Sequence, residues 1–389
     1  MKIAFVIQRY GEEIIGGAEY FTRLIAERMI KFHEIEILTT CAKEYHNWMN
    51  EYPQGIDVIA GVPVRRFKNK KFRNMEKFVK IQEYVFNNDH TIDEEMQWVN
   101  EQGPYCPDLI YYIQNHQDDY DLFVFFTYRY FPSYYGANKI KKKSILVPFA
   151  ENDPALSLKI TSDLFSNVTG IIYSTPEERE LINNNVNHPE ITKKWDIIGC
   201  GIDSLFKPSG TLPVNNKSFI LYLGRIEGFS KGCNELFDYY CRWVNEADDA
   251  PDLVLAGYDA IGVPKHDKIH YLGFVSEQEK INLLYGAIYL VMPSPYESFS
   301  IVTLESLEYG TPVLVNGKCS VLKGHCKRSN AGLWYNSFDE FVECSQILIN
   351  NTRLRTQMSK NGIDYIKKFY SWSLIEEKYL QMFDSVHKL

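Results

Sequence analysis

The chain opens with a short apolar run, a helical pattern and a second apolar run. Residues 3–8 predict a buried strand, and residues 18–32 carry apolar side chains on one stripe, as an amphipathic helix does. Residues 36–40 complete a β-α-β unit. Further short apolar runs are separated by polar or helical stretches and occur at residues 121–126, 144–147, 170–173 and 195–198. Short runs spaced in this way predict a buried parallel sheet.

A second series of the same kind follows a stretch without periodicity. Residues 201–218 are rich in Pro, Gly and Asn, which is typical of a linker. Apolar runs then alternate again with helical patterns, at residues 219–223, 253–256, 269–272, 288–292 and 312–315. The sequence therefore predicts an α/β protein with two domains, 1–203 and 204–371, followed by an amphipathic helix at 372–389.

Residues 65–117 do not fit this alternation and predict an insertion in the first domain. The insertion begins with cations mixed with aromatic rings, and the segment 65–80 could contact an anionic membrane surface or a phosphate of a substrate. A solvated loop and helix face is the simpler alternative.

Composition narrows the class of protein. The 389 residues are 45% hydrophobic and 24% charged, which is typical of folded domains, and 389 residues suit two domains. The net charge of -8 argues against a nucleic-acid binder. The N-terminal pattern is that of a strand and not of a secretory signal, and no run of 18 apolar residues occurs. Eight cysteines without a Cys-x-x-Cys pair predict reduced thiols. We therefore expect a cytoplasmic protein, with membrane contact only at its periphery.

The loop after the run 219–223 carries the first candidate chemistry. Lys231 is expected at the N-terminus of a helix, where the helix dipole disfavours a cation by a few tenths of a kcal/mol. An anion at this position would account for Lys231. Gly224, Gly228 and Gly232 would let the backbone approach that anion, and Arg225 could bind two phosphate oxygens. The loop thus predicts a diphosphate site; two ordinary surface cations in a Gly-rich turn are the alternative.

The loop after the run 288–292 carries a second set of candidate site residues. Ser298 or Ser300 can cap a helix that ends at Gly310, and Glu297 lies in the loop before it. Glu305 falls on or beside the buried stripe of that helix, where a carboxylate needs partners. A ribose diol could supply two hydroxyl donors to Glu305, and Glu297 could accept from sugar hydroxyls. The alternative for Glu305 is an ion pair with a nearby lysine.

These elements together resemble a known family. Glu297 and Glu305 form a Glu-x7-Glu pattern, which is accompanied by the Gly-Arg pair at 224–225 and the Lys-Gly pair at 231–232. Four further segments match in order and spacing, at residues 16–19, 199–203, 272–276 and 369–372. The chain is similar to the retaining glycosyltransferase family 4, within the glycosyl transferases group 1. The resemblance implies the GT-B fold, in which two Rossmann-like domains face each other across a cleft and the C-terminal helix returns to the N-terminal domain.

The resemblance also implies roles for individual residues. Arg225 and Lys231 would neutralise the pyrophosphate of a UDP-sugar or GDP-sugar, Glu297 would position the transferred hexose, and Glu305 would hold the ribose. Further donor contacts are implied for Gly16, Gly17, Gly224, Val275, Ser298, Phe299, Ser300, Ile301 and Val302. No metal or cofactor is expected, because cations would do the work of a divalent ion. The acceptor would be a glycan or lipid-linked glycan, bound by the N-terminal domain, in surface polysaccharide synthesis.

The chain departs from the family pattern at one position. Glu151 occupies the place of a His that often stands in the N-terminal wall of the active site. Glu151 could accept from a hydroxyl of the sugar or acceptor; Asn152 or Asp153 could do so instead, or the segment could be a plain loop. The pair His266 and His270 lies in a loop leading into a strand, which argues against zinc. Cys319, His325 and Cys326 lack a fourth metal ligand at typical spacing.

Other functions for the same fold stay open from the sequence. A nucleotide-sugar epimerase and an inactive nucleotide-sugar-binding protein are the main alternatives. A dinucleotide oxidoreductase ranks last, because the first loop lacks Gly-x-Gly-x-x-Gly.

Overall fold

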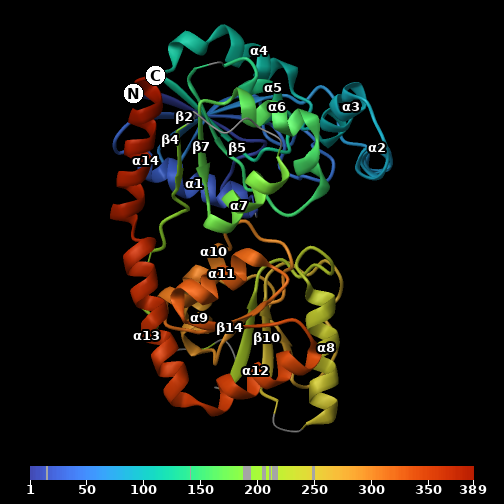
Figure 1. Ribbon diagram of the computed structural model, residues 1–389, viewed down its shortest axis with the longest axis vertical. Coiled ribbons are helices and arrows are strands. Elements are labelled where there is room, and N and C mark those ends of the chain that lie inside the picture. Colours follow the sequence, from blue (N-terminus) through green and yellow to red (C-terminus); the bar gives the residue numbers. More distant parts are fainter. Residues whose placement is uncertain are drawn as a thin grey trace. The chain divides into compact units, whose positions relative to one another are not determined.

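The chain folds into two compact α/β units. The computed structural model describes residues 1–14, 16–140, 142–186, 194–203, 207–209, 212, 218–247 and 250–389. One unit comprises Met1–Cys200 and Ile375–Leu389, and the other comprises Gly201–Leu374 (Figure 1). Much of the predicted linker, at 204–206, 210–211 and 213–217, lies outside the described residues. Two α/β units built on parallel sheets are what the sequence predicts.

The first unit is built on a sheet that, in the described residues, has eight strands in the order β3-β4-β2-β1-β5-β6-β7-β8. Neighbouring strands are parallel except β3 and β4, which are antiparallel. The strands are β1 (Lys2–Val6), β2 (Glu34–Thr40), β3 (Gly55–Ile59), β4 (Val62–Phe67), β5 (Leu122–Phe126), β6 (Ser144–Val147), β7 (Gly170–Tyr173) and β8 (Lys194–Ile197). The chain order reverses between β1 and β5, and such a reversal opens a crevice at the carboxyl ends of the strands.

The helices of the first unit include three in the predicted insertion. They are α1 (Gly17–Met29), α2 (Met75–Asn87), α3 (Ile92–Gln102), α4 (Pro107–Asn115), α5 (Phe131–Ala137), α6 (Lys159–Asn167) and α7 (Pro176–Asn185), with short 3-10 helices η1 (Gln117–Asp119) and η2 (Pro154–Ser157). The last helix, α14 (Trp372–His387), joins this unit from Ile375 onward. Tyr379 of α14 is fully buried there and donates a hydrogen bond to the Gly199 carbonyl, 3.2 Å away.

The start of the predicted insertion needs correction. Residues 65–67 belong to β4, so the extra segment begins after Phe67. The strand escaped prediction because it contains two cations that pair inside the fold. Arg65 Nε lies 2.8 Å from Glu36, and Arg66, only 2% exposed, pairs with Asp57 at 2.9 Å. The sequence alone does not show these partners, and without them two adjacent arginines look like surface.

Several of the other cations in the basic segment 65–80 also have partners within the unit. Lys70 pairs with Asp108 at 2.7 Å, and Lys71 pairs with Glu101. Membrane contact through this segment stays a prediction. In the part of the chain that the structure describes, no helix is both long and apolar enough to cross a membrane.

The second unit is built on a parallel sheet with, among the described residues, six strands in the order β11-β10-β9-β12-β13-β14. The strands are β9 (Phe219–Leu223), β10 (Asp252–Ala256), β11 (Ile269–Tyr271), β12 (Leu290–Met292), β13 (Val313–Asn316) and β14 (Gly332–Tyr335). This order reverses between β9 and β12, so the second crevice lies outside the ends of these two strands.

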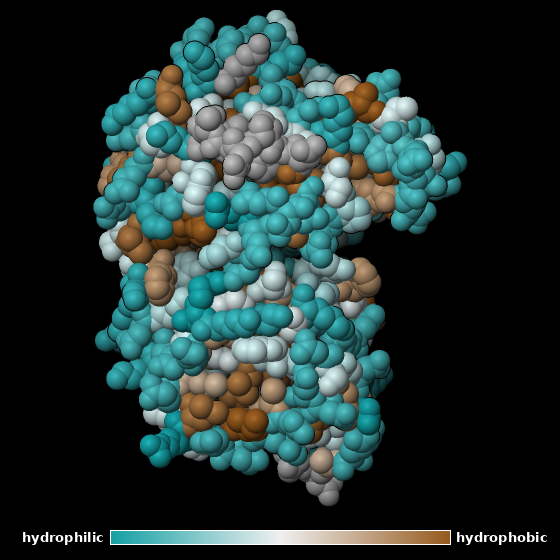
Figure 2. Space-filling model, in the orientation of Figure 1, coloured by the Kyte–Doolittle hydropathy of each residue, from teal (hydrophilic) through white to brown (hydrophobic). Residues whose placement is uncertain are grey.

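Helices cover both faces of the second sheet. They are α8 (Cys233–Glu246), α9 (Glu277–Gly286), α10 (Ile301–Glu308), α11 (Ser320–Ser329), α12 (Phe338–Asn350) and α13 (Thr352–Phe369). Figure 1 shows α8 and α9 on opposite sides of the sheet; α8 packs beside α12, and α9 packs beside α10. The buried stripe of α8 includes Leu236, Tyr240 and Trp243. On the face seen in Figure 2, hydrophilic residues cover most of each unit and hydrophobic ones form separate patches, because the large apolar side chains are mostly in the cores.

Candidate functional site

Four loops gather at the carboxyl ends of the strands in the second unit. They follow β9, β10, β11 and β12. Backbone hydrogen bonds join the first three: Gly224 N–H donates to the Ala256 carbonyl (3.0 Å), and Gly257 N–H donates to the Gly273 carbonyl (2.8 Å). The loops therefore form one continuous rim around the point where the strand order reverses.

Two glycines let the rim close. Gly257 has φ +135°, and a Cβ there would lie 1.9 Å from the Gly224 carbonyl oxygen. Gly232 has φ +69°, and a Cβ there would lie 2.2 Å from the Pro293 carbonyl oxygen. Both positions need glycine for the left-handed conformation and for the close approach. The second contact holds the loop after β9 directly against the loop after β12.

This contact brings Lys231 and Glu297 together. The Lys231 ammonium lies 2.8 Å from Glu297 Oε1, with 30% and 13% of the two side chains exposed. Helix α8 begins at Cys233 with Gly232 as its N-cap, so Lys231 stands just before the positive end of the helix, as predicted. The carboxylate of Glu297 compensates the cation here. A separate role was predicted for each residue from the sequence, which does not show that they form an ion pair.

Arg225 stands on the same rim. The Tyr222 hydroxyl donates to the Arg225 carbonyl oxygen at 2.7 Å. Burial raises the pKa of the Tyr222 phenol; the charge of Glu297 adds to this shift and the charge of Arg225 opposes it. Both charged groups therefore lie near this one phenol, and the structure places Arg225 and Glu297 in one neighbourhood.

Glu227 fixes the loop between Arg225 and Lys231. Its carboxylate accepts from the backbone N–H of Phe229 at 3.1 Å and of Ser230 at 2.9 Å, and also from the Ser230 hydroxyl. Burial acts to raise the pKa of Glu227, but these hydrogen bonds outweigh burial and the pKa is lowered. An ionised Glu227 thus holds the shape of the loop, a role that the sequence analysis missed.

The loop after β12 has a supporting residue of its own. The fully buried His325 has Nε2 2.9 Å from the Phe299 carbonyl oxygen and Nδ1 3.1 Å from the Tyr365 hydroxyl. Burial lowers the pKa of His325 to about 3. The neutral ring then donates from Nε2 and accepts at Nδ1. His325 therefore positions the loop just before α10 and is no metal candidate; its only sequence signal was its place near Cys319 and Cys326.

The start of α10 is conformationally unusual. Its N-cap, Ser300, has φ +63°, which is rare for a residue other than glycine, and its hydroxyl lies 2.9 Å from the Thr303 hydroxyl. Residues in such strained backbone conformations cluster at active sites and ligand-binding sites, where the surrounding structure holds them in place. Ser298, Phe299 and Ser300 lead into the helix, and Ile301 and Val302 form its first turn. The backbone N–H groups of a first turn have no partner within their own helix.

Glu305 has the lysine partner that the sequence left open. Lys280 of α9 donates to Glu305 Oε1 at 3.0 Å. Burial raises the pKa of the Glu305 carboxyl, and Lys280 opposes the shift. Val275, expected near the base, is half-buried in the loop before α9, whose N-cap Ser276 forms a capping box with Glu279.

The site residues expected in the first unit lie at the carboxyl ends of its strands. Gly16 is the N-cap of α1, and a Cβ there would lie 2.1 Å from Glu19 Oε2, so packing explains this glycine. A Cβ at Gly17 would meet nothing within 4 Å. Glu151 is half-buried in the loop after β6. Burial raises the pKa of Glu178 to about 7, backbone hydrogen bonds oppose this, and the nearby charge of Glu151 adds to it. The roles of Gly16, Gly17 and Glu151 stay predictions.

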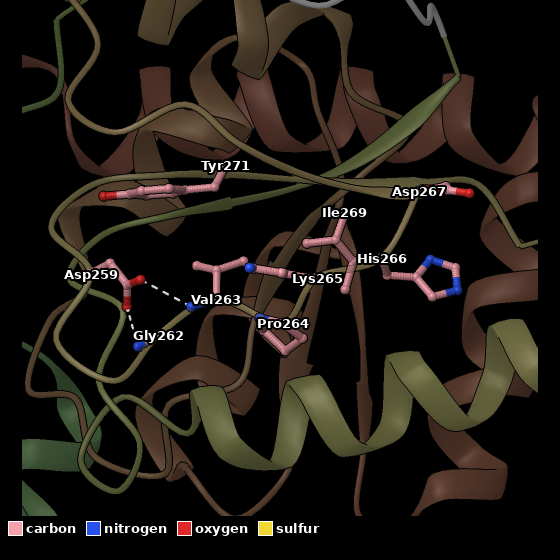
Figure 3. Close-up of a pocket in the computed structure, with 9 residues that line it drawn as sticks. All are labelled: Asp259, Gly262, Val263, Pro264, Lys265, His266, Asp267, Ile269 and Tyr271. Carbon is pink, nitrogen blue, oxygen red and sulfur yellow. Dashed lines mark hydrogen bonds between the residues drawn. The ribbon is translucent and has the colours of Figure 1, made fainter.

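A separate hollow lies beside the edge strand of the second sheet. Figure 3 shows it between β11 and the loop that precedes it, with Asp259 at one end and His266 at the other. Asp259 accepts from the backbone N–H of Gly262 (2.8 Å) and Val263 (2.9 Å), which explains its conformation. None of the predicted site residues lines this hollow. Across the described ranges, no three His, Cys, Asp or Glu residues cluster as metal ligands, and His270 bonds Asp252 at 2.8 Å.

Known proteins are similar to this chain in the sequence of the second unit and in the fold of both units. Residues 206–365 match the family model described as glycosyl transferases group 1. An uncharacterized glycosyltransferase of Methanocaldococcus jannaschii is 25% identical over 228 residues, 54% of this chain and 55% of that protein. The phosphatidyl-myo-inositol mannosyltransferase of Mycobacterium leprae is 23% identical over 230 residues, 53% and 60% of the two chains. The match thus spans little more than half the length of these relatives.

The fold matches over the full length. The structure of Anabaena HepE in complex with UDP and glucose superposes with a TM-score of 0.72 at 15% identity, covering 99% of this chain and 100% of that one. The chain therefore has the two-domain α/β architecture of the GT-B fold, which the sequence predicted.

Proposed function

We propose that the protein is a retaining glycosyltransferase that moves a hexose from a UDP-sugar or GDP-sugar to a glycan or lipid-linked acceptor without a metal ion. The observation that carries the proposal is the Lys231–Glu297 pair at the reversal point of the second sheet. A cation and a carboxylate are held there side by side. The cation suits the diphosphate of a nucleotide sugar, and the carboxylate suits the hydroxyls of its sugar.

The diphosphate would replace Glu297 as the partner of Lys231. Its oxygens would draw Lys231 away from Glu297 and would also engage Arg225 and the backbone N–H groups of the first turn of α10. Glu297 would then accept hydrogen bonds from hydroxyls of the transferred sugar. Glu305 would accept from the ribose, and Val275 would contact the base. Residues 16–17 would contact the donor from the first unit.

Charge on the departing diphosphate is what the cations would stabilise during transfer. The bond from the anomeric carbon to the phosphate oxygen breaks, and the bond to the acceptor oxygen forms on the same face. The acceptor's proton passes to the leaving phosphate oxygen, so no protein nucleophile is needed. Arg225 and Lys231 stabilise the transition state more than the ground state, because negative charge grows on that oxygen. Glu151 would accept from a hydroxyl of the sugar or acceptor.

The relatives support this choice over the alternatives. The matched family and both relatives are named as glycosyltransferases, and HepE was solved with UDP and glucose. Neither an epimerase nor an inactive binding protein is favoured by these names. The mannosyltransferase relative, named for a phosphatidyl-myo-inositol substrate, fits a lipid-linked acceptor in surface polysaccharide synthesis. We expect the enzyme in the cytoplasm, with peripheral contact to the membrane.

The test is transfer from a panel of UDP-sugars and GDP-sugars by the wild type and by Arg225→Ala and Lys231→Ala. Each variant loses a charged hydrogen bond worth about 1.5 to 3 kcal/mol, so kcat/KM falls about ten- to hundredfold. The matched control is Arg242→Ala, which removes an exposed ion pair with Glu246 on α8 and should keep full activity. Wild-type rates in both site variants would reject the proposal. The anomeric configuration of the product, read by NMR, decides whether configuration is retained.

A further inference from the structure

Three arginines converge at the reversal point of the first sheet. Arg9 follows β1, Arg129 follows β5, and Arg73 lies just before α2, in the segment between β4 and β5. The loops after β1 and β5 flank the crevice of this sheet, which is where ligands of such sheets bind. No role in the proposed donor chemistry uses these arginines.

Contacts join Arg9 and Arg73 through Tyr45, and all three arginines act on the neighbouring Tyr130. The Arg9 guanidinium lies 5.4 Å from the centre of the Tyr45 ring, and Arg73 donates to the Tyr45 carbonyl oxygen at 2.9 Å. Arg73 also lies 4.8 Å from the centre of the Trp48 ring, and Trp48 meets Tyr130 edge to face at 5.6 Å. Burial raises the pKa of the Tyr130 phenol, Glu19 adds to the shift, and all three arginines oppose it.

Two of the arginines already have a carboxylate. Arg9 Nε lies 2.6 Å from Glu19 Oε1, and Arg129 lies 2.9 Å from Asp153 Oδ2. Both ion pairs are substantially shielded from solvent, with side-chain exposures of 9% and 7% for the first and 29% and 19% for the second. Among the described residues, neither Glu19 nor Asp153 forms an ion pair with Arg73.

The hydrogen bonds of Arg73 to the described residues all go to neutral carbonyl groups. Its Nε and one terminal nitrogen donate to the Gln102 carbonyl, the former at 3.1 Å, and its other terminal nitrogen donates to Tyr45. No ion pair to Arg73 occurs in the described ranges of the chain. A guanidinium has five N–H donors, so two remain for a ligand. Burial lowers the pKa of Arg73 to about 10, and the charges of Arg129 and Arg9 act in the same direction.

The cluster therefore carries one positive charge without a counterion. A partly buried cation next to two others is unfavourable until an anion joins it. Arginine presents paired N–H donors that match the oxygens of a phosphate or carboxylate. The side chains of Arg73, Arg129 and Tyr130 are each partly exposed, so a ligand can reach the cluster.

We propose that this arginine cluster binds an anionic group of the acceptor, a phosphate or a carboxylate, through Arg73, with Arg9 and Arg129 beside it. That the ligand is an acceptor rests on the proposed function. The anion comes either from a free sugar acid or phosphate or from a lipid headgroup. The ordinary alternative is that Arg73 only clamps the Tyr45 and Gln102 carbonyls.

The test measures binding to the full chain carrying Arg225→Ala and Lys231→Ala, so that the donor site does not compete for anions. The probes are glucose 6-phosphate, glucuronate and neutral glucose, together with phosphatidylinositol and phosphatidylcholine vesicles. Arg73→Gln is compared with Arg73→Lys and with Arg179→Gln. Arg179 is the matched control, because its guanidinium stacks 3.9 Å from the centre of the Trp195 ring in the same unit.

An anionic probe should bind at least tenfold more tightly than its neutral counterpart, and this preference should disappear in Arg73→Gln, survive in Arg179→Gln and return in part in Arg73→Lys. The probe that binds identifies the source of the anion. A preference that persists in Arg73→Gln, or no preference for any anionic probe, would overturn the inference. UDP and GDP binding to the otherwise unchanged chain is measured in parallel. If the nucleotides bind while anions do not, only the inference fails; if neither nucleotide binds, the proposed function fails whatever the cluster does.

Discussion

Lys231 and Glu297, 66 residues apart in the chain, form an ion pair of 2.8 Å that joins the loops after β9 and β12. A carboxylate in contact with a cation competes with any other anion for it. We therefore expect a diphosphate bound at this place to weaken the pair, and the two residues should respond differently to substitution.

Glu297→Gln should separate nucleotide binding from transfer. The neutral amide no longer competes for Lys231, so UDP or GDP should bind as tightly as before or more tightly. Transfer should fall about tenfold or more, because the sugar loses a charged acceptor. Calorimetry gives the nucleotide affinity and steady-state kinetics give kcat. A parallel loss of both would mean that Glu297 has only a structural role.

Glu305 can be tested through the ribose. If its carboxylate accepts from the ribose hydroxyls, the wild type should bind UDP about tenfold more tightly than 2′-deoxy-UDP, and Glu305→Gln should lose most of that preference. GDP and its 2′-deoxy form make the same comparison if guanosine is the base. An unchanged preference in the variant would leave Glu305 with its Lys280 ion pair alone.

Gly232→Ala should lower the free energy of unfolding of the second unit by more than the strain of a left-handed alanine alone. The added methyl group meets the Pro293 carbonyl oxygen at 2.2 Å, so we expect a loss of about 2 kcal/mol or more. Gly273→Ala is the matched control. Its φ of +68° equals that of Gly232 within a degree, but a Cβ there meets nothing within 4 Å, so the expected loss is only about 1 kcal/mol. Equal losses in urea unfolding would show that the loop after β12 can move away.

His325 should make stability depend on pH. Its pKa is lowered to about 3 in the folded protein from 6.5. Between these values the unfolded chain binds the extra proton, so stability falls as pH drops below 6.5, by up to about 1.4 kcal/mol per unit. His325→Gln keeps a donor for the Phe299 carbonyl and removes the titration. Relative to this variant, the wild type should lose about 1 to 2 kcal/mol between pH 7.5 and pH 5; equal pH profiles would contradict the account.

Much of this fold could be predicted from apolar periodicity, because strands buried on both faces, such as β1, β5 and β9, are continuous apolar runs. Strand β4 could not be predicted in this way. Its Arg66 is buried because it pairs with a carboxylate of β3, whereas the apolar pattern assigns a charged residue to the surface. The site divides in the same way. The place of Lys231 follows from the stripe of α8, but its pairing with Glu297 depends on the closure at Gly232. Whether Glu305 meets a lysine depends on how α9 packs beside α10, and His325 supports Phe299 through a contact between distant segments.

The most direct measurement is the structure of the chain with UDP or GDP bound. We expect the phosphate oxygens to lie within hydrogen-bond distance of Lys231 Nζ and the Arg225 guanidinium, with Glu297 released from Lys231. A diphosphate in the hollow between Asp259 and His266, with the Lys231–Glu297 ion pair intact, would contradict this expectation.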